Sequence, residues 1–244
     1  MYQFESRIRY SELHEDGLLA VPKIVDYFQD CSIFQSESLG VGLDYLTERK
    51  IAWILSFWQI QILRRPGIGE RVTVGTFPYE FKGFLGMRNF LMKDEAGRML
   101  VQANSIWSLL DTERFRPVRP GKEMMAAYTL EERLPMEYAA RKLVMEEGGE
   151  RLAPIQITPD FQDTNRHVNN ARYVTIAMDA LEMMGEYPQV RELWIEYKGQ
   201  AHKGDLVYPV MLRTAEGYQM KLENEQGTGL INMHIMTAPD GSGS

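Results

Sequence analysis

A carboxylate, an amide and an imidazole that could act together in catalysis stand at alternate positions in one short polar segment: Asp163, Asn165 and His167. In an extended chain, residues i, i+2 and i+4 project from one face, so we expect this carboxylate, amide and imidazole to converge. A carboxylate or an imidazole can act as a base near neutral pH, and an amide can orient water or a carbonyl oxygen. The same residue types are common in loops and helix caps, so the pattern needs support from the elements around it.

Hydrolysis of a thioester is one reaction that such a set can perform. The carbonyl carbon must be attacked by water or by a carboxylate, and the developing oxyanion needs fixed donors. A thiol leaves readily because its pKa is about 8.5, so a strong general acid is less necessary. We expect Asp163 to activate water or to attack directly, Asn165 to orient the water or the carbonyl, and His167 to hold the carboxylate and shuttle the proton.

A predicted amphipathic helix, Ala171–Met184, follows the polar segment directly, and Asn169 or Asn170 can cap it. The free N–H groups and positive dipole end of its N-terminus would lie behind the three side chains. A similar helix is predicted at Pro22–Leu39, where proline suits the first turn and Gly40 can end the helix. The two helices suggest an internal duplication.

Each predicted helix is followed by segments rich in the residues that favour β-strands. In order, these segments are Ala52–Leu63, Arg71–Tyr79, Gly86–Lys93, Met99–Asp111, Leu193–Gly199, Val207–Thr214, Tyr218–Glu223 and Gly229–Thr237. The turn at Lys93–Gly97 corresponds to the turn at Glu223–Gly227, and each stands between two alternating runs. The duplication therefore extends beyond the helices to the strands.

A long helix followed by antiparallel strands must bury its apolar face against their sheet. Two such repeats can pair their sheets edge to edge, as identical subunits do in a dimer. We therefore predict an α+β double hot-dog fold, in which two tandem helix-plus-antiparallel-sheet repeats form one continuous sheet. We expect an acyl-chain-binding N-terminal repeat at 1–125, a connector at 126–153, a C-terminal repeat with the catalytic residues at 154–240 and a disordered tail at 241–244.

Composition excludes several classes of protein. Hydrophobic residues make up 44% of the chain and charged residues 25%, which is typical of a soluble globular protein. The net charge of -7 argues against nucleic-acid binding, which normally requires a basic excess. Cys31 is the single cysteine, so we expect no internal disulfide and a reducing compartment. We find no apolar run long enough for a membrane span and no signal peptide, and we expect a cytoplasmic protein.

Four blocks carry a family resemblance, and they follow in order along most of the chain: AWILSFWQIQILRRPGIGERV (52–72), ANSIWSLLDTERFRPVRP (103–120), DTNRHVNNARY (163–173) and IEYKGQAHKGD (195–205). In these blocks the chain resembles the acyl-acyl carrier protein thioesterases of plants and bacteria. The resemblance implies a double hot-dog fold, no metal or organic cofactor, and hydrolysis of fatty acyl-acyl carrier protein thioesters to free fatty acid. It also implies that Asp163, Asn165 and His167 match the family's catalytic Asp, Asn and His.

The chain departs from the family pattern at two neighbouring positions. Gln200 stands where the family usually carries a glutamate, and Ala201 stands where the plant enzymes carry a cysteine. Gln200 remains a candidate site residue because its amide can position water, but it cannot act as a base. Ala201 has no thiol, so we do not expect a Cys–His mechanism, and the base must be Asp163 or His167.

The resemblance also gives a use to two clusters of basic residues. Acyl carrier proteins are acidic, so the implied partner, a carrier protein with an acyl-phosphopantetheine group, could be steered by positive charge. The candidate docking residues are Arg64, Arg65, Arg114, Arg116 and Arg119. Ordinary solvated loop charges are the alternative reading of both clusters.

Other readings of the function stay open at this point. The chain could hydrolyse acyl-coenzyme A instead, or bind acyl groups without turnover because of Gln200 and Ala201. The residue types do not separate attack by water from attack by Asp163, and they do not give the preferred acyl length. Both a monomer and a homodimer are compatible with an internally paired fold.

Overall fold

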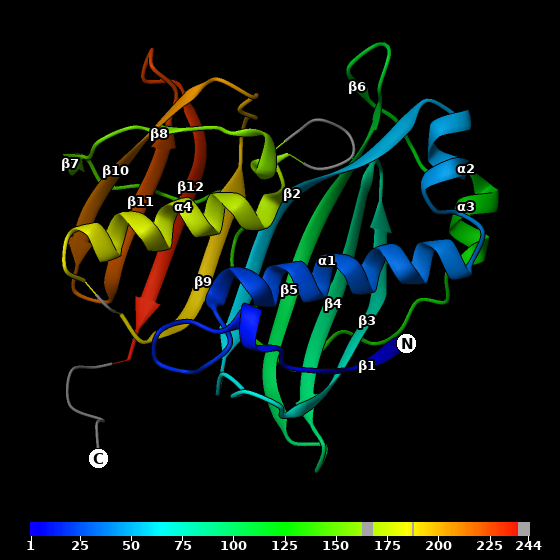
Figure 1. Ribbon diagram of the computed structural model, residues 1–244. Coiled ribbons are helices and arrows are strands. Elements are labelled where there is room, and N and C mark those ends of the chain that lie inside the picture. The colour runs from blue at the N-terminus through cyan, green and yellow to red at the C-terminus, as the bar shows by residue number, and fades with distance from the viewer. Residues whose placement is uncertain (163–167, 187, 239–244) are drawn as a thin grey trace. The chain divides into compact units, whose positions relative to one another are not determined.

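The computed structural model describes residues 1–162, 168–186 and 188–238 of the chain. The chain divides into two compact units, Met1–Tyr138 (unit 1) and Ala139–Ser244 (unit 2). Figure 1 labels the helices and strands of both units. The boundary falls within the segment expected to connect the repeats, so part of that segment belongs to each unit.

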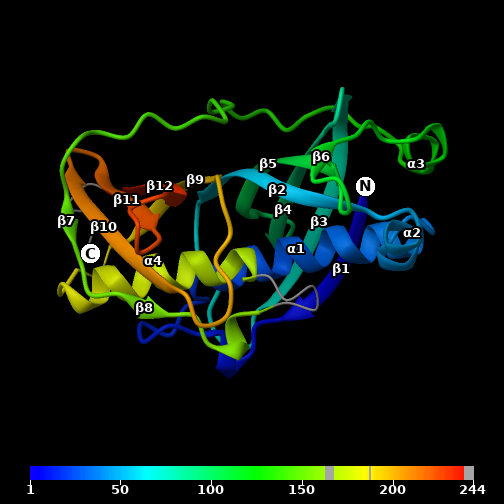
Figure 2. The same ribbon diagram turned by 90° about the horizontal axis from the view of Figure 1, so that it is seen from above.

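Unit 1 contains one long helix and an antiparallel sheet of five main strands, to which one two-residue strand is added. Along the chain its elements are β1 (Tyr2–Arg7), a 3-10 helix (Tyr10–Glu12), α1 (Val21–Ser38), α2 (Leu43–Glu48), β2 (Ile51–Ile62), β3 (Arg71–Lys82), β4 (Leu85–Asp94), β5 (Met99–Asp111), β6 (Arg116–Pro117) and α3 (Lys122–Ala127). The strand order is β1-β3-β4-β5-β2, and the short β6 pairs with the end of β5. In Figure 2 α1 is seen along one face of this sheet.

The core of unit 1 lies between α1 and the sheet. Apolar residues recur along one side of α1, and among them Phe28 is fully buried. Its ring centroid lies 6.0 Å from that of Trp58 on β2 and 5.2 Å from that of Phe90 on β4. Aromatic residues bury large apolar areas, so this cluster holds the helix on the strands.

Unit 2 repeats the arrangement of one helix on one antiparallel sheet. Its elements are β7 (Glu150–Arg151), β8 (Ile155–Gln156), a 3-10 helix (Pro159–Phe161), α4 (Asn170–Met183), β9 (Val190–Tyr197), β10 (Leu206–Thr214), β11 (Gly217–Glu223) and β12 (Gly229–Thr237). Within the unit the strand order is β9-β12-β11-β10-β7, and β8 also pairs with β10. The helix α4 contacts β10 and β11, and its buried residues include Val174, Ala177 and Leu181.

The two units share the same turn chemistry, which supports the internal duplication. Between β4 and β5, Asp94 Oδ1 accepts from the N–H groups of Ala96 and Arg98 at 3.0 and 2.9 Å. Between β11 and β12, Asn224 Oδ1 accepts from Gln226 and Thr228 at 3.1 and 2.8 Å. Gly97 and Gly227 each have φ +78°, a left-handed conformation that a residue with a Cβ rarely adopts. The predicted correspondence of these turns is confirmed.

The connecting segment covers the other face of each sheet through polar contacts. In unit 1, the buried Asn89 accepts from Leu134 N–H and Tyr138 O–H at 3.1 and 3.0 Å. In unit 2, Gln219 exchanges hydrogen bonds with Glu146, one at 2.8 Å and one at 3.2 Å. A buried amide is costly unless it is hydrogen-bonded, so these contacts allow polar side chains to be covered.

The two predicted helices are confirmed as α1 and α4. The eight predicted strands are confirmed as β2, β3, β4, β5, β9, β10, β11 and β12. The sequence analysis missed β1 and α2, and it placed the end of β9 two residues too late. Within the described residues, no helix is long and apolar enough to cross a membrane.

Candidate functional site

The start of α4 is held in place by its own cap and by the residues before it. Asn169 Oδ1 accepts from the N–H of Ala171 at 2.9 Å, which confirms one of the two predicted caps. The N–H of Asn169 donates to Phe161 O at 2.9 Å, and Gln162 pairs with Val168 in an isolated β-bridge. The two flanks of 163–167 therefore lie side by side at the N-terminus of α4.

The predicted catalytic residues Asp163, Asn165 and His167 lie outside the described residues. The structure describes the residues that flank them, Gln162 and Val168, which pair with each other. Their convergence stays a prediction.

Two tyrosines join the start of α4 to the segment after β9. The hydroxyl of Tyr173, on α4, accepts from the N–H of Ala201 at 2.8 Å. The hydroxyl of Tyr197, at the end of β9, donates to Asn170 O at 3.2 Å. The two rings meet edge to face with their centroids 6.2 Å apart. The bonds and the ring contact together form a tie, hereafter the tyrosine tie, between two segments that are distant in sequence.

Burial keeps both tyrosines protonated. It raises the pKa of Tyr173 to about 12 and raises the pKa of Tyr197 well above its usual value. The hydroxyl of Tyr197 therefore keeps the proton that it donates to α4. The sequence analysis did not find the tie, because its partners are separated by 27 and 28 residues and only the fold brings them together.

The two positions at which the chain departs from the family pattern, Gln200 and Ala201, lie at the tyrosine tie. Ala201 is 1% exposed, and its N–H is the group bound by Tyr173. Gln200, directly before it, is exposed. Since β9 ends at Tyr197, strand alternation does not continue to Gln200. Glu196, near the end of β9, accepts from Leu143 N–H and from Asn232 Nδ2 at 3.3 and 3.1 Å, so its carboxylate is engaged within unit 2.

The single thiol is not placed for chemistry. Cys31 is fully buried on α1, where its Sγ lies 3.6 Å from Val74 O. Burial raises the pKa of this thiol to about 12, so it is not ionised near neutral pH. In the described part of the chain, no group of three or more His, Cys, Asp or Glu is arranged to hold a metal ion.

Arg64 and Arg65 are engaged within unit 1. Arg64 forms a forked ion pair with Glu70, with N–O distances of 2.8 and 2.9 Å. Arg65 pairs with Asp16, and its side chain is only 15% exposed. These pairs tie the end of β2 to neighbouring loops, and docking by Arg64 and Arg65 stays a prediction.

The other basic cluster is exposed. Arg114, Arg116 and Arg119 lie on or beside the turn that joins β5 to β6. The carboxylate of Asp111 accepts from the backbone N–H of Arg114 at 2.8 Å, and this bond helps to lower the pKa of Asp111. The three guanidinium groups are therefore available at the surface of unit 1.

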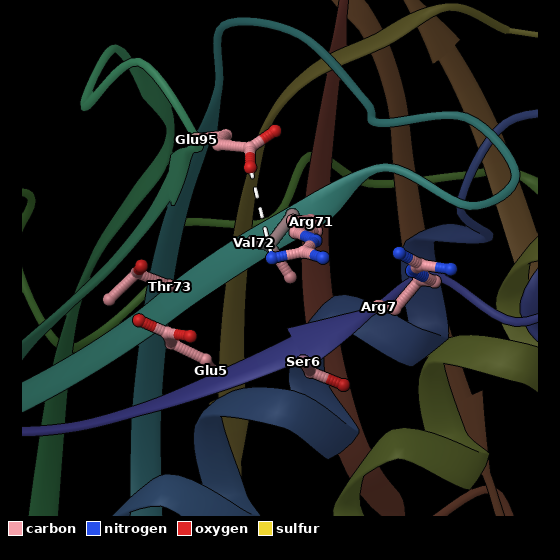
Figure 3. A pocket seen from close by; sticks show the side chains of 7 residues that line it. All are labelled: Glu5, Ser6, Arg7, Arg71, Val72, Thr73 and Glu95. Carbon is pink, nitrogen blue, oxygen red and sulfur yellow. Dashed lines mark ion pairs between the residues drawn. The ribbon is translucent and has the colours of Figure 1, made fainter.

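A pocket of about 380 Å³ lies elsewhere in unit 1, along β1 and β3 (Figure 3). Its lining is mainly polar, and Arg71 there approaches Glu95 to 3.9 Å. Such a lining does not suit an alkyl chain. None of the predicted catalytic residues lines this pocket.

Comparison with known protein families finds a matching domain model for each of the two parts of the chain. Residues 1–128 match the acyl-ACP thioesterase N-terminal domain, and residues 156–238 match the acyl-ACP thioesterase C-terminal domain, where ACP is acyl carrier protein. The chain belongs to the acyl-ACP thioesterase family. The predicted family is therefore confirmed.

The similar curated members of the acyl-ACP thioesterase family are longer plant proteins. The chloroplastic acyl-[acyl-carrier-protein] hydrolase FATB1 of Cuphea viscosissima is 22% identical over 97% of this chain and 61% of its own length. FATB3 of the same species is 25% identical over 97% of this chain and 62% of its own length. The chain thus spans about three-fifths of these relatives.

Solved structures confirm the predicted α+β double hot-dog fold of this family. An acyl-ACP thioesterase from Bacteroides thetaiotaomicron superposes with a TM-score of 0.86 at 20% identity, covering 97% of both chains. The 12:0-ACP thioesterase from Umbellularia californica gives a TM-score of 0.85 at 16% identity, covering 98% of this chain and 97% of that chain.

The tyrosine tie predicts a measurable loss of stability in Tyr173→Phe. The substitution keeps the ring and removes the hydroxyl, leaving the buried N–H of Ala201 without its acceptor. We expect the free energy of unfolding to fall by about 1–3 kcal/mol. Urea denaturation monitored by circular dichroism measures the change.

Tyr208→Phe is the matched control, since the ring that Tyr208 places 4.0 Å from Arg151 is kept in phenylalanine. We expect this control to stay within about 0.5 kcal/mol of wild type. An equal loss in both variants would contradict the role given to the bond between Tyr173 and Ala201.

Proposed function

We propose that the chain hydrolyses fatty acyl-ACP thioesters to free fatty acid and ACP. The observation that carries the proposal is that both domain models of the acyl-ACP thioesterase family match, and together they cover most of the chain. The names of the curated relatives, which are acyl-[acyl-carrier-protein] hydrolases, agree with this reaction. We place the reaction in the cytoplasm, a reducing compartment that suits the single buried thiol of Cys31.

We divide the work between the two repeats. The N-terminal repeat, expected at 1–125, would receive the acyl chain. The C-terminal repeat, expected at 154–240, would carry the chemistry ahead of α4. The capped start of α4 supports this division, because a helix N-terminus offers free N–H groups and a positive dipole end to an anion.

In the proposed reaction Asp163 supplies the carboxylate that activates water or attacks the carbonyl carbon itself. Asn165 orients the water or the carbonyl oxygen, and His167 holds the carboxylate and shuttles the proton. Gln200 would assist by positioning water through its amide. Its exposure leaves the amide accessible, and its neighbour Ala201 is fixed by the tyrosine tie.

Removal of one carboxylate tests the proposed activity. We expect Asp163→Ala to lower kcat by about a hundredfold or more across a panel of acyl-ACP thioesters of increasing chain length. The reason is that a water molecule near neutral pH is a poor nucleophile without a base. Release of free thiol, followed with a chromogenic disulfide, measures the rate.

Asp160→Ala is the matched control, because Asp160 is a nearby carboxylate on the 3-10 helix before the site and bonds to Thr158. We expect it to keep the wild-type rate. An Asp163→Ala enzyme with full activity would sink the proposal, as would a wild-type protein that binds acyl groups without turnover. Faster turnover of acyl-coenzyme A than of any acyl-ACP would favour the coenzyme A alternative.

We propose that positive charge on unit 1 steers the acidic carrier to the enzyme. Of the candidate docking residues, Arg114, Arg116 and Arg119 have exposed guanidinium groups, whereas Arg64 and Arg65 are paired with Glu70 and Asp16. Exposed charges raise the rate of encounter with a partner of opposite sign and act most strongly at low salt.

Charge reversal tests this steering. We expect the double variant Arg114→Glu/Arg116→Glu to raise KM for acyl-ACP at low salt, and we expect the effect to shrink as ionic strength approaches about 1 M. Hydrolysis of a small acyl thioester should stay unchanged. Steady-state kinetics at several salt concentrations measure both.

Arg141→Glu/Lys142→Glu is a control of equal charge change, because Arg141 and Lys142 are also adjacent exposed cations. If this control raised KM as much as the Arg114 and Arg116 variant, the effect would follow from net charge, and docking at the β5–β6 turn would be wrong.

A further inference from the structure

The turn between β5 and β6 is held by hydrogen bonds to the side chain and the backbone of Asp111. Asp111 Oδ1 accepts from the N–H groups of Glu113 and Arg114 at 2.9 and 2.8 Å. The N–H of Phe115 donates to Asp111 O at 2.9 Å, and Asp111 pairs with Arg116 across the short ladder. This element, residues 111–117, is hereafter called the Phe115 hairpin.

Phe115 holds an unfavourable backbone conformation within this hairpin. Its φ is +51°, in the left-handed region that a residue with a Cβ occupies only at a cost. Among the described non-glycine residues, Lys50 is the other one with a positive φ. Glycine or asparagine is the usual choice at such a turn position, because neither meets the same steric penalty.

Burial of the Phe115 side chain does not offset the free-energy cost of this backbone conformation. Phe115 is 84% exposed, so its ring is presented to solvent in the turn between β5 and β6. A large exposed aromatic residue in a strained conformation indicates a use outside the folded monomer. Aromatic residues are also the side chains that most often anchor protein interfaces.

The surroundings of the ring indicate which kind of partner it meets. Arg114 and Arg116 flank Phe115 in the chain, Arg119 follows, and all three are exposed. Residues 111–119 carry three arginines against the two carboxylates of Asp111 and Glu113, and Glu113 is paired with Lys50. The result is a local excess of positive charge on a chain with a net charge of -7. The combination of an apolar ring and a rim of guanidinium groups complements a surface that carries carboxylates around an apolar spot.

We propose that the Phe115 hairpin is the docking element for the acyl carrier protein, with the ring of Phe115 as its apolar anchor. This inference rests on the proposed function, because the substrate is what brings an acidic carrier to the enzyme. The ring packs on an apolar spot of the carrier, while Arg114, Arg116 and Arg119 pair with the carboxylates around that spot. The hairpin is already ordered by Asp111, so little conformational freedom is lost when the carrier binds.

The strain at Phe115 allows a test in which stability and binding move in opposite directions. Phe115→Gly relieves the left-handed backbone and removes the ring. We expect the Tm of the variant to match or exceed that of wild type, and KM for acyl-ACP to rise about tenfold, as for a loss of an interface anchor. We expect kcat and the hydrolysis of acyl-coenzyme A to stay unchanged, because the hairpin does not contribute to the proposed chemistry.

Two further variants separate the ring from the backbone. Phe115→Asn keeps a Cβ in a residue that tolerates this φ, and it should weaken carrier binding as Phe115→Gly does. Tyr10→Ala removes a different aromatic residue, which is 82% exposed, and should leave KM for acyl-ACP at the wild-type value. A rise in KM with Tyr10→Ala as large as with Phe115→Gly would overturn the proposal.

Direct binding distinguishes failure of this inference from failure of the proposed function. The Kd for ACP loaded with a hydrolysis-resistant acyl amide, measured by calorimetry, should rise about tenfold in Phe115→Gly. If wild type hydrolyses acyl-ACP but the variant has unchanged KM and Kd, the docking role is wrong and the proposed function stands. If wild type hydrolyses no thioester yet binds ACP with an affinity that depends on Phe115, the proposed function is wrong and docking stands. If wild type does not bind ACP, the docking role is wrong.

Discussion

Each unit depends on burying one long helix against one antiparallel sheet. That contact buries the apolar side of α1, which includes Phe28, and the apolar side of α4, which includes Leu181. The opposite face of each sheet carries buried or half-buried amides, which would be costly if left without partners. The chain solves this with its connecting segment, since Asn89 in unit 1 and Gln219 in unit 2 bond to it. The segment between the repeats is therefore part of both structures and not a loose linker.

The two repeats keep the same framework and differ in the segment ahead of the helix. Asp94 and Asn224 build matching turns, so the hairpin chemistry is common to both copies. Before α1, Asp16 is held by Arg65 and by the N–H of Leu18, and Ala20 offers no side-chain cap. Before α4, Asn169 caps the helix and the flanks of 163–167 are joined. In unit 1 Asp16 is thus committed to structure, and unit 2 is the copy proposed for chemistry.

The sequence predicted the elements that have a strong periodic signal and missed those that lack one. Both long helices and the strands around the matched turns follow from apolar spacing and turn residues. β1 has no fully buried residue, and α2 is only six residues long, so neither shows a clear apolar pattern. The engagement of Arg65 could not be predicted, because its partner Asp16 lies 49 residues away in the chain. The tyrosine tie is hidden for the same reason, since sequence patterns report local periodicity and not which distant segments meet.

The environment of Ala201 limits how the proposed chemistry can work. Ala201 is 1% exposed, and its methyl side chain can neither accept nor donate a proton. The backbone N–H of Ala201 is bound by Tyr173, whose raised pKa keeps it a neutral hydroxyl. Tyr197 is neutral for the same reason and donates its proton to Asn170 O. Both hydroxyls of the tyrosine tie are therefore uncharged near neutral pH. This agrees with the proposal that proton transfer is carried out by Asp163 and His167, ahead of α4.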